Sequence, residues 1–230
     1  MKYNLSKFTG KPFIKTSLDV CKYPVYLVND FKKSFDNLPY DTHFPDQNKT
    51  RQRRCAHYNI DIENNNFSIK HQSKKIYRQN NKKFLPIIFP EIEKPYDLFI
   101  FHMIQMASQL VIINHHSKIT KMSVNFHQIR QICYPGIDSH NSMEGIYQGN
   151  CDYIISACVL NKHNICGAES SVYNLKKDES LFSTVLEENE FIFHDCSSLY
   201  NYVTPVKYLL KDSIALKGYR DIIGIDINIT

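Results

Sequence analysis

The chain has 230 residues, 43% of them hydrophobic and 13% aromatic, with no tryptophan and a formal net charge of +5. This apolar fraction is enough to bury a large core, which excludes a low-complexity disordered chain. The length suits a single β sandwich or barrel, and the modest charge alone does not indicate a nucleic-acid-binding protein.

The first 45 residues are expected to form an N-terminal extension with a short helix near Asp30–Leu38, followed by one domain over residues 46–230. The N-terminus lacks the continuous apolar segment of a signal peptide. No later run reaches the roughly 18 apolar residues of a membrane span. We therefore expect a cytoplasmic protein without membrane contact.

Residues 50–114 change from strand-like to helical periodicity. Residues 50–69 are strand-like, with a turn at Asn64–Asn66 and then a flexible loop over Lys74–Lys83. Asp97 can cap a long helix to about Asn114, because apolar residues recur at helical spacing and neither glycine nor proline interrupts them. This helix is expected to pack against a sheet.

Most of the chain after Ser117 predicts short strands separated by Gly, Pro, Asn and Asp. A helix over Asp178–Leu186 is expected to interrupt them. Helices first and many strands afterwards indicate an α+β protein built on an antiparallel sandwich or jelly roll, with helices packed on one sheet. The expected strands are 120–132, 145–148, 152–160, 169–174, 190–194, 199–203 and 219–229.

Two of these strands place polar side chains on informative faces. In 120–132, Gln128 and Arg130 continue the apolar face of the strand, which suggests that they line a cavity. In 219–229, the isoleucines of Ile223–Ile229 form one face, and Arg220 lies on the other, which is expected to open toward something polar. Either arginine taken alone could instead be a surface residue or half of an ion pair.

An ordered set of short motifs spans residues 45–230. The set resembles the family of Fe(II)/2-oxoglutarate-dependent dioxygenases that hydroxylate free aliphatic L-amino acids such as isoleucine. The resemblance implies a double-stranded β-helix, the jelly roll of the cupin and dioxygenase type, with helices packed on the larger sheet. The motifs are Arg51-Gln52-Arg53, His127-Gln128-Ile129-Arg130, Glu144-Gly145-Ile146, Gly149-Asn150-Cys151-Asp152, Asn164-Ile165-Cys166-Gly167-Ala168-Glu169-Ser170, Val203-Thr204-Pro205 and Arg220-Asp221.

The iron ligands of that family are missing at the matching positions. The family holds iron with a His-x-Asp pair directly after Glu-Gly-Ile and with a second His just before Val-Thr-Pro; here these positions are Tyr147, Gly149 and Asn201. Glycine has no donor, an amide is neutral, and a phenol must first lose a proton with an ordinary pKa of about 10. The resemblance therefore implies a pocket whose iron site has been dismantled.

The family's carboxylate-binding arginine corresponds to Arg220. The resemblance implies that this guanidinium binds the distal carboxylate of 2-oxoglutarate, and we expect Gln128 and Arg130 to line the same cavity. A structural ion pair between Arg220 and Asp221 is the alternative.

Substitute metal ligands are a separate hypothesis. His140, Glu144 and His194 lie near the lost positions in sequence and could supply imidazole and carboxylate donors. The seven cysteines lack a paired metal-ligand spacing, and we expect reduced, packed thiols. Among them, Cys151, Cys166 and Cys196 could in principle act as nucleophiles with His194, but nothing in the sequence favours one of them.

Three functions remain open. The first is a noncatalytic or repurposed dioxygenase-like protein that binds a small carboxylate or amino acid, with 2-oxoglutarate as the implied ligand. The second is an active amino-acid hydroxylase that binds Fe(II) through substitute ligands. The third is a protein-interaction or effector module that uses the basic residues Arg51–Arg54; no nucleic-acid-binding module is recognisable, so nucleic acid is not the expected partner.

Overall fold

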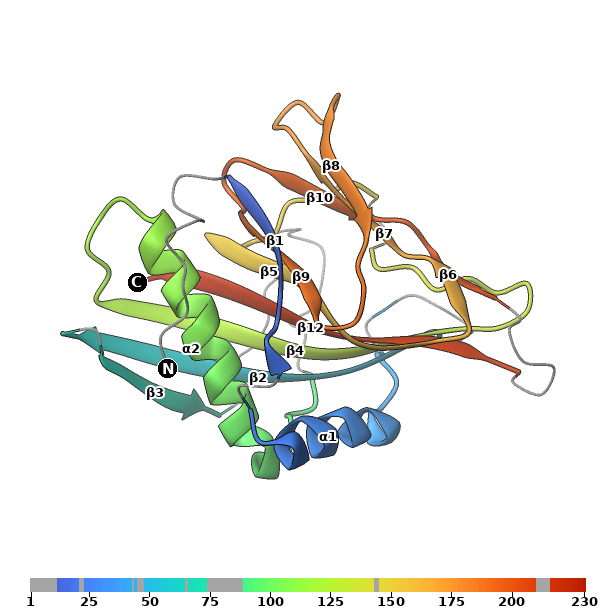
Figure 1. Ribbon diagram of the computed structural model, residues 1–230, viewed down its shortest axis with the longest axis horizontal. Coiled ribbons are helices and arrows are strands. Elements are labelled where there is room, and N and C mark those ends of the chain that lie inside the picture. The colour runs from blue at the N-terminus through green and yellow to red at the C-terminus, as the bar shows by residue number, and fades with distance from the viewer. Residues whose placement is uncertain are drawn as a thin grey trace.

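The computed structural model describes residues 12–20, 23–42, 44, 48–64, 66–73, 89–142, 145–209 and 216–230. Its body is a seven-stranded antiparallel sheet in the order β1-β9-β5-β12-β4-β2-β3, shown in Figure 1. The strands of this large sheet are β1 (Phe13–Ser17), β2 (Arg51–Glu63), β3 (Asn66–Gln72), β4 (Lys121–Cys133), β5 (Tyr153–His163), β9 (Glu190–Asp195) and β12 (Gly218–Ile229).

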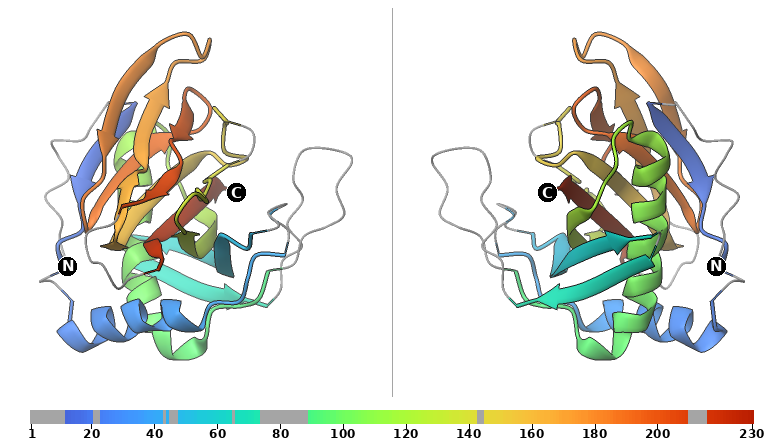
Figure 2. Two further views of the ribbon diagram at one scale, coloured as in Figure 1. Left: turned by 90° about the vertical axis from the view of Figure 1, so that its right-hand side faces the viewer. Right: turned by 90° about the vertical axis from the view of Figure 1, so that its left-hand side faces the viewer.

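A smaller sheet covers one face of the large sheet, which we call the inner face. Apolar residues of both sheets meet in one buried cluster that includes Ile129, Val159 and Ile222 from the large sheet and Val172 from the small one. Two antiparallel sheets packed in this way form the jelly roll, or double-stranded β-helix, as predicted (Figure 2). The small sheet has the order β10-β7-β8, and β11 pairs with β6; the bounds are β6 (Ile165–Gly167), β7 (Glu169–Tyr173), β8 (Ser180–Val185), β10 (Tyr200–Val203) and β11 (Val206–Tyr208).

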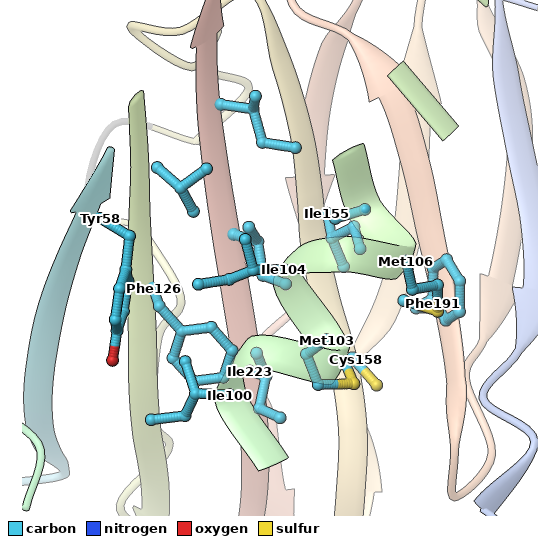
Figure 3. Packing of buried hydrophobic residues seen from close by; sticks show 14 of the residues in the cluster. Tyr58, Ile100, Met103, Ile104, Met106, Phe126, Ile155, Cys158, Phe191 and Ile223 are labelled. Carbon is cyan, nitrogen blue, oxygen red and sulfur yellow. The ribbon is translucent and has the colours of Figure 1, made fainter. Parts of the chain in front are cut away.

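The helices cover the opposite face of the large sheet, which we call the helix face. They are α1 (Val25–Ser34) and α2 (Asp97–Asn114), with short 3-10 turns at η3 (Phe35–Asn37) and η4 (Lys94–Tyr96). Figure 3 shows side chains of α2 against Phe126 of β4 and Ile223 of β12. Length and composition alone would let α2 cross a membrane, but half of its residues are buried within the protein.

Sequence periodicity predicted several elements well. The helix over 97–114 is confirmed, and the strands expected near 120–132, 152–160 and 219–229 are β4, β5 and β12. The N-terminal helix begins at Val25 instead of Asp30. Within the first 45 residues, β1 pairs with β9, so this segment takes part in the large sheet.

The helix predicted over Asp178–Leu186 is wrong. Residues Ser180–Val185 form β8, which pairs antiparallel with β7 and alternates between exposed and half-buried side chains. Two of its six residues, Thr184 and Val185, are β-branched, and such residues favour a pleated, half-buried surface. The strand expected over 145–148 is reduced to a single bridge between Tyr147 and Asn201. The loop over Lys74–Lys83 lies outside the described residues.

Candidate functional site

Arg220 lies on the inner face of β12 and is the most unusual side chain in the fold. It is 1% exposed, and its Nε, Nη1 and Nη2 atoms form no hydrogen bond. Its cross-strand neighbours are Gln131 on β4 and Lys162 on β5, neither of which is an acid. Burial lowers the pKa of Arg220 to about 10. The guanidinium is therefore a buried cation without a counterion among the described residues.

Gln131 adds a second unsatisfied group beside Arg220. It is completely buried, and both its amide oxygen and its amide nitrogen lack a hydrogen-bond partner. Buried polar groups are usually paired, and Arg220 and Gln131 are two adjacent exceptions on one face of the sheet. Gln131 is missing from the predicted site. Its pairing opposite Arg220 places both side chains on the same face of the sheet.

Asp221 does not pair with Arg220, because the strand turns it to the helix face. Both of its oxygens bind Arg130, with Nε–Oδ1 and Nη2–Oδ2 distances of 2.6 and 2.8 Å. Arg130 also binds Asp36 of η3 at 2.8 Å. The alternative of an Arg220–Asp221 ion pair is therefore wrong.

The prediction that Arg130 and Gln128 line the cavity of Arg220 is also wrong. Both residues point to the helix face, where Gln128 Nε2 donates to Ser34 Oγ at 2.6 Å and Arg130 bridges Asp221 and Asp36. Residues 128 and 130 alternate with 127, 129 and 131, so they cannot share a face with Gln131. Their polar groups bind the polar end of α1 and the η3 turn, and they do not contact a ligand cavity.

The structure brings Tyr147 and Asn201 together. Their backbones exchange two hydrogen bonds, Tyr147 N to Asn201 O at 3.0 Å and Asn201 N to Tyr147 O at 2.9 Å. The Tyr147 phenol accepts a hydrogen bond from Asn141 Nδ2 at 3.2 Å. Burial raises the pKa of Tyr147, and its polar neighbours Asn201 and Arg51 offset this only in part. At neutral pH the phenol therefore keeps its proton.

Two thiols fill the space beside Gly149. A Cβ atom at this position would lie 2.9 Å from Cys151 Sγ and 3.0 Å from Cys196 Sγ. The two sulfur atoms are themselves in contact at 2.9 Å. A carboxylate side chain therefore does not fit at position 149 unless the thiols move.

The substitute ligands are not brought together. His194 points to the inner face and is fully buried; its Nδ1 donates to the Asp195 carbonyl oxygen, and its Nε2 is unpartnered. His140 is exposed, and Glu144 lies outside the described residues. Within the described ranges, no three His, Cys, Asp or Glu side chains are arranged to hold a metal ion. Cys166 is exposed on β6.

The basic residues Arg51–Arg54 do not form a single solvated face. Arg51 and Arg53 alternate with Arg54, and Arg51 is held by Asp41 at 3.3 Å and by the Asn141 carbonyl at 2.9 Å. Arg54 lies on the other side of the strand and pairs with Glu93 at 2.9 Å. This arrangement does not favour an interaction module built on the three arginines together.

The family model described as 2OG-Fe dioxygenase matches residues 32–226. No curated protein sequence matches this chain. Solved structures share its fold, among them three that are distant in sequence. IDO from Bacillus thuringiensis has a TM-score of 0.78 at 14% identity, over 100% of this chain and 97% of that one.

The other two structures are similarly distant in sequence. A bsmA homologue from Methylobium petroleophilum PM1 has a TM-score of 0.79 at 12% identity, over 96% of this chain and 89% of that one. The Fe(II)/α-ketoglutarate-dependent dioxygenase TqaL has a TM-score of 0.70 at 12% identity, over 97% of this chain and 84% of that one. At these identities, the likeness to the three structures establishes the shared fold alone.

Proposed function

Because this chain belongs to the 2OG-Fe dioxygenase family, we propose that it uses Arg220 to bind a small carboxylate, such as 2-oxoglutarate or an amino acid, without a working iron centre. The observation that carries this proposal is the Arg220 guanidinium, which is buried and unpartnered. The family's arginine position is thus occupied by the one residue type that can hold a carboxylate bidentately.

The energetics of Arg220 favour an anionic ligand. A buried cation without a partner costs several kcal/mol, even after relaxation of its surroundings. A carboxylate bound bidentately would restore the hydrogen bonds of the guanidinium, each worth about 1.5–3 kcal/mol for a charged group. Gln131 could donate its amide N–H to the same carboxylate or to a neighbouring oxygen of the ligand.

The residues at the iron positions do not fit a ferrous ion. Tyr147 keeps its proton, Gly149 offers no donor, and Asn201 offers a neutral amide. The thiols of Cys151 and Cys196 occupy the space where an aspartate would stand. These observations support a dismantled iron site, and we therefore assign no oxygen-activating step to this chain.

Calorimetric titration of the protein with 2-oxoglutarate in the presence of a chelator tests the proposal. The wild type is expected to bind, and Arg220→Met is expected to bind at least about 100-fold more weakly, the equivalent of about 2.7 kcal/mol. Arg54→Met, which removes a guanidinium from the outside of β2, serves as the matched control. Equal affinity in wild type and Arg220→Met would refute the proposal.

An active hydroxylase with substitute ligands is the second candidate, because His194 points inward with an unpartnered Nε2. Titration with Fe(II) or Mn(II) separates the two candidates. Stoichiometric metal binding that is lost in His194→Gln, together with turnover of 2-oxoglutarate, would replace the first function by the second. If 2-oxoglutarate alone gives a heat of binding and added metal does not change it, the result supports carboxylate binding without an iron centre.

A further inference from the structure

Three polar side chains form a row across the inner face of the large sheet, and Arg220 is not part of this row. Cys55 on β2 stands opposite His127 on β4, and His127 stands opposite Gly224, two residues before Asp226 on β12. Cys55 Sγ lies 2.5 Å from His127 Nδ1, and His127 Nε2 lies 3.0 Å from Asp226 Oδ2. Thiol, imidazole and carboxylate thus form one continuous line.

Such a line has the order of a nucleophile, its base and the group that orients the base. One imidazole nitrogen contacts the sulfur and the other contacts the carboxylate, so a proton can move from sulfur to His127 while Asp226 stabilises the imidazolium. Each of the three groups comes from a different strand of a rigid sheet. This places them with more precision than a loop would provide.

The surrounding charges favour the thiolate. Arg53 Nη2 lies 2.7 Å from the same imidazole nitrogen that contacts Cys55. Burial raises the pKa of the Cys55 thiol, but His127 and Arg53 lower it by more, so it lies below its usual range. Burial lowers the pKa of His127, and Cys55 and Asp226 raise it above its usual range. With two positive and two negative groups, the ionised cluster is neutral as a whole.

Cys55 differs in this respect from other buried thiols of the chain. Burial raises the pKa of Cys133 to about 11 and that of Cys158 to about 12. No histidine is among the described groups that shift the pKa of either thiol. They are packing residues, whereas Cys55 is held by a base.

A pocket of about 200 Å³ lies next to this cluster. Its lining includes His57, which follows Cys55 by two residues on β2, and Asn125, which precedes His127 by two residues on β4. Cys55 and His127 themselves do not line it. At about 3.3 Å per residue, the two positions lie roughly 7 Å from the thiol and its base. The polar lining, with Ser123 and Gln72, suits a small ligand that accepts and donates hydrogen bonds.

We propose that Cys55 is a nucleophile that attacks the carbonyl carbon of a small activated acyl compound. A carbon–sulfur bond forms as the bond from the acyl carbon to its oxygen or sulfur leaving group breaks. The leaving group takes the proton that His127 received from the thiol, and the Arg53 guanidinium stabilises the oxyanion of the intermediate. The products are an acylated Cys55 and the protonated leaving group. This site requires neither Arg220 nor a metal, so it stands independently of the proposed carboxylate binding.

Acetylation by p-nitrophenyl acetate tests the proposal, in a Cys166→Ser background that removes the exposed thiol. Peptide mapping by mass spectrometry is expected to find the acetyl group on Cys55, formed at least tenfold faster than on Cys133 or Cys158. His127→Gln is expected to slow Cys55 acetylation by about 100-fold or more, because the base is lost. Asp226→Asn is expected to slow it by a smaller factor.

A second measurement does not depend on replacing His127. In folded protein at neutral pH, the ultraviolet absorbance due to thiolate is expected to be lower in Cys55→Ser than in the wild type. Acetylation of Cys55 no faster than that of Cys133 and Cys158, or an unchanged rate in His127→Gln, would overturn the proposal. So would the absence of a thiolate difference between wild type and Cys55→Ser.

Discussion

Arg220 and Arg130 lie in adjacent strands and differ in one respect, the presence of a counterion. Arg130 binds Asp221 and Asp36, whereas no described side chain binds Arg220. An unpaired buried charge destabilises the fold, and a ligand that supplies the missing charge recovers the loss. Stability therefore does not account for an unpaired arginine at this position, whereas the proposed binding of a carboxylate does.

The two arginines therefore predict opposite effects of the same substitution. Arg220→Met should raise the free energy of unfolding of the ligand-free protein by about 1–4 kcal/mol, because a buried charge is removed. Arg130→Met should lower it by about 3–5 kcal/mol, because Asp221 is left buried and unpaired. Denaturant unfolding monitored by circular dichroism measures both. Destabilisation by Arg220→Met would contradict the description of Arg220 as unpaired.

Gly149 predicts a packing effect specific to two thiols. Gly149→Ala should destabilise the protein by about 1–3 kcal/mol, because the added methyl lies 2.9 Å from Cys151 Sγ and 3.0 Å from Cys196 Sγ. In a Cys151→Ala, Cys196→Ala background the same change should cost little, since the space is then open. A double-mutant cycle from unfolding curves gives the coupling. A coupling free energy near zero would show that position 149 does not face the two thiols.

His194 predicts a dependence of stability on pH. Burial lowers the pKa of His194, so the unfolded chain takes up a proton at a higher pH than the folded protein does. The stability associated with neutral His194 is therefore present above the ordinary pKa of about 6.5 and is lost as pH falls below it, by at most about 1.4 kcal/mol per pH unit. His194→Gln should weaken this dependence between pH 7.5 and 5.5. If the free energy of unfolding changes with pH equally in wild type and in His194→Gln, this prediction is refuted.

At the scale of elements, α2 shows where sequence reasoning is strong. Its bounds match an uninterrupted helical pattern, which is a local feature. The predicted cap at Asp97 is wrong, because Tyr96 is the N-cap residue and no side chain caps the helix. The strand β8 shows the opposite case, because its conformation is imposed by pairing with β7 and not by its own composition. Local propensity cannot reveal a partner strand, and this is why the helix over Asp178–Leu186 was predicted wrongly.

The packing of α2 gives a matched pair of leucines. Leu110 is fully buried against the large sheet, whereas Leu98 is 49% exposed at the other end of the same helix. Leu110→Ala should cost about 2–5 kcal/mol of unfolding free energy, and Leu98→Ala should cost less than about 1 kcal/mol. Thermal and denaturant unfolding compare the two. Equal losses would contradict the assignment of α2 to the core of the large sheet.

At the scale of the whole molecule, the sequence predicted the jelly roll and part of the site. The motif order led to Arg220, Tyr147 and Asn201, and strand alternation correctly separated the two faces of β12. It did not reveal that Gln128 and Arg130 meet Ser34 and Asp36, because those partners lie 94 residues away in the chain. Nor did it reveal the line from Cys55 to Asp226, which exists only when three strands are placed side by side.

The most direct measurement is a crystal structure of the protein grown with 2-oxoglutarate and Mn(II), with anomalous scattering recorded for the metal. The account predicts a ligand carboxylate bound bidentately by Arg220 and no metal peak between Tyr147 and Asn201. A metal ion coordinated there, or an Arg220 side chain that remains without a carboxylate while 2-oxoglutarate binds elsewhere, would contradict it.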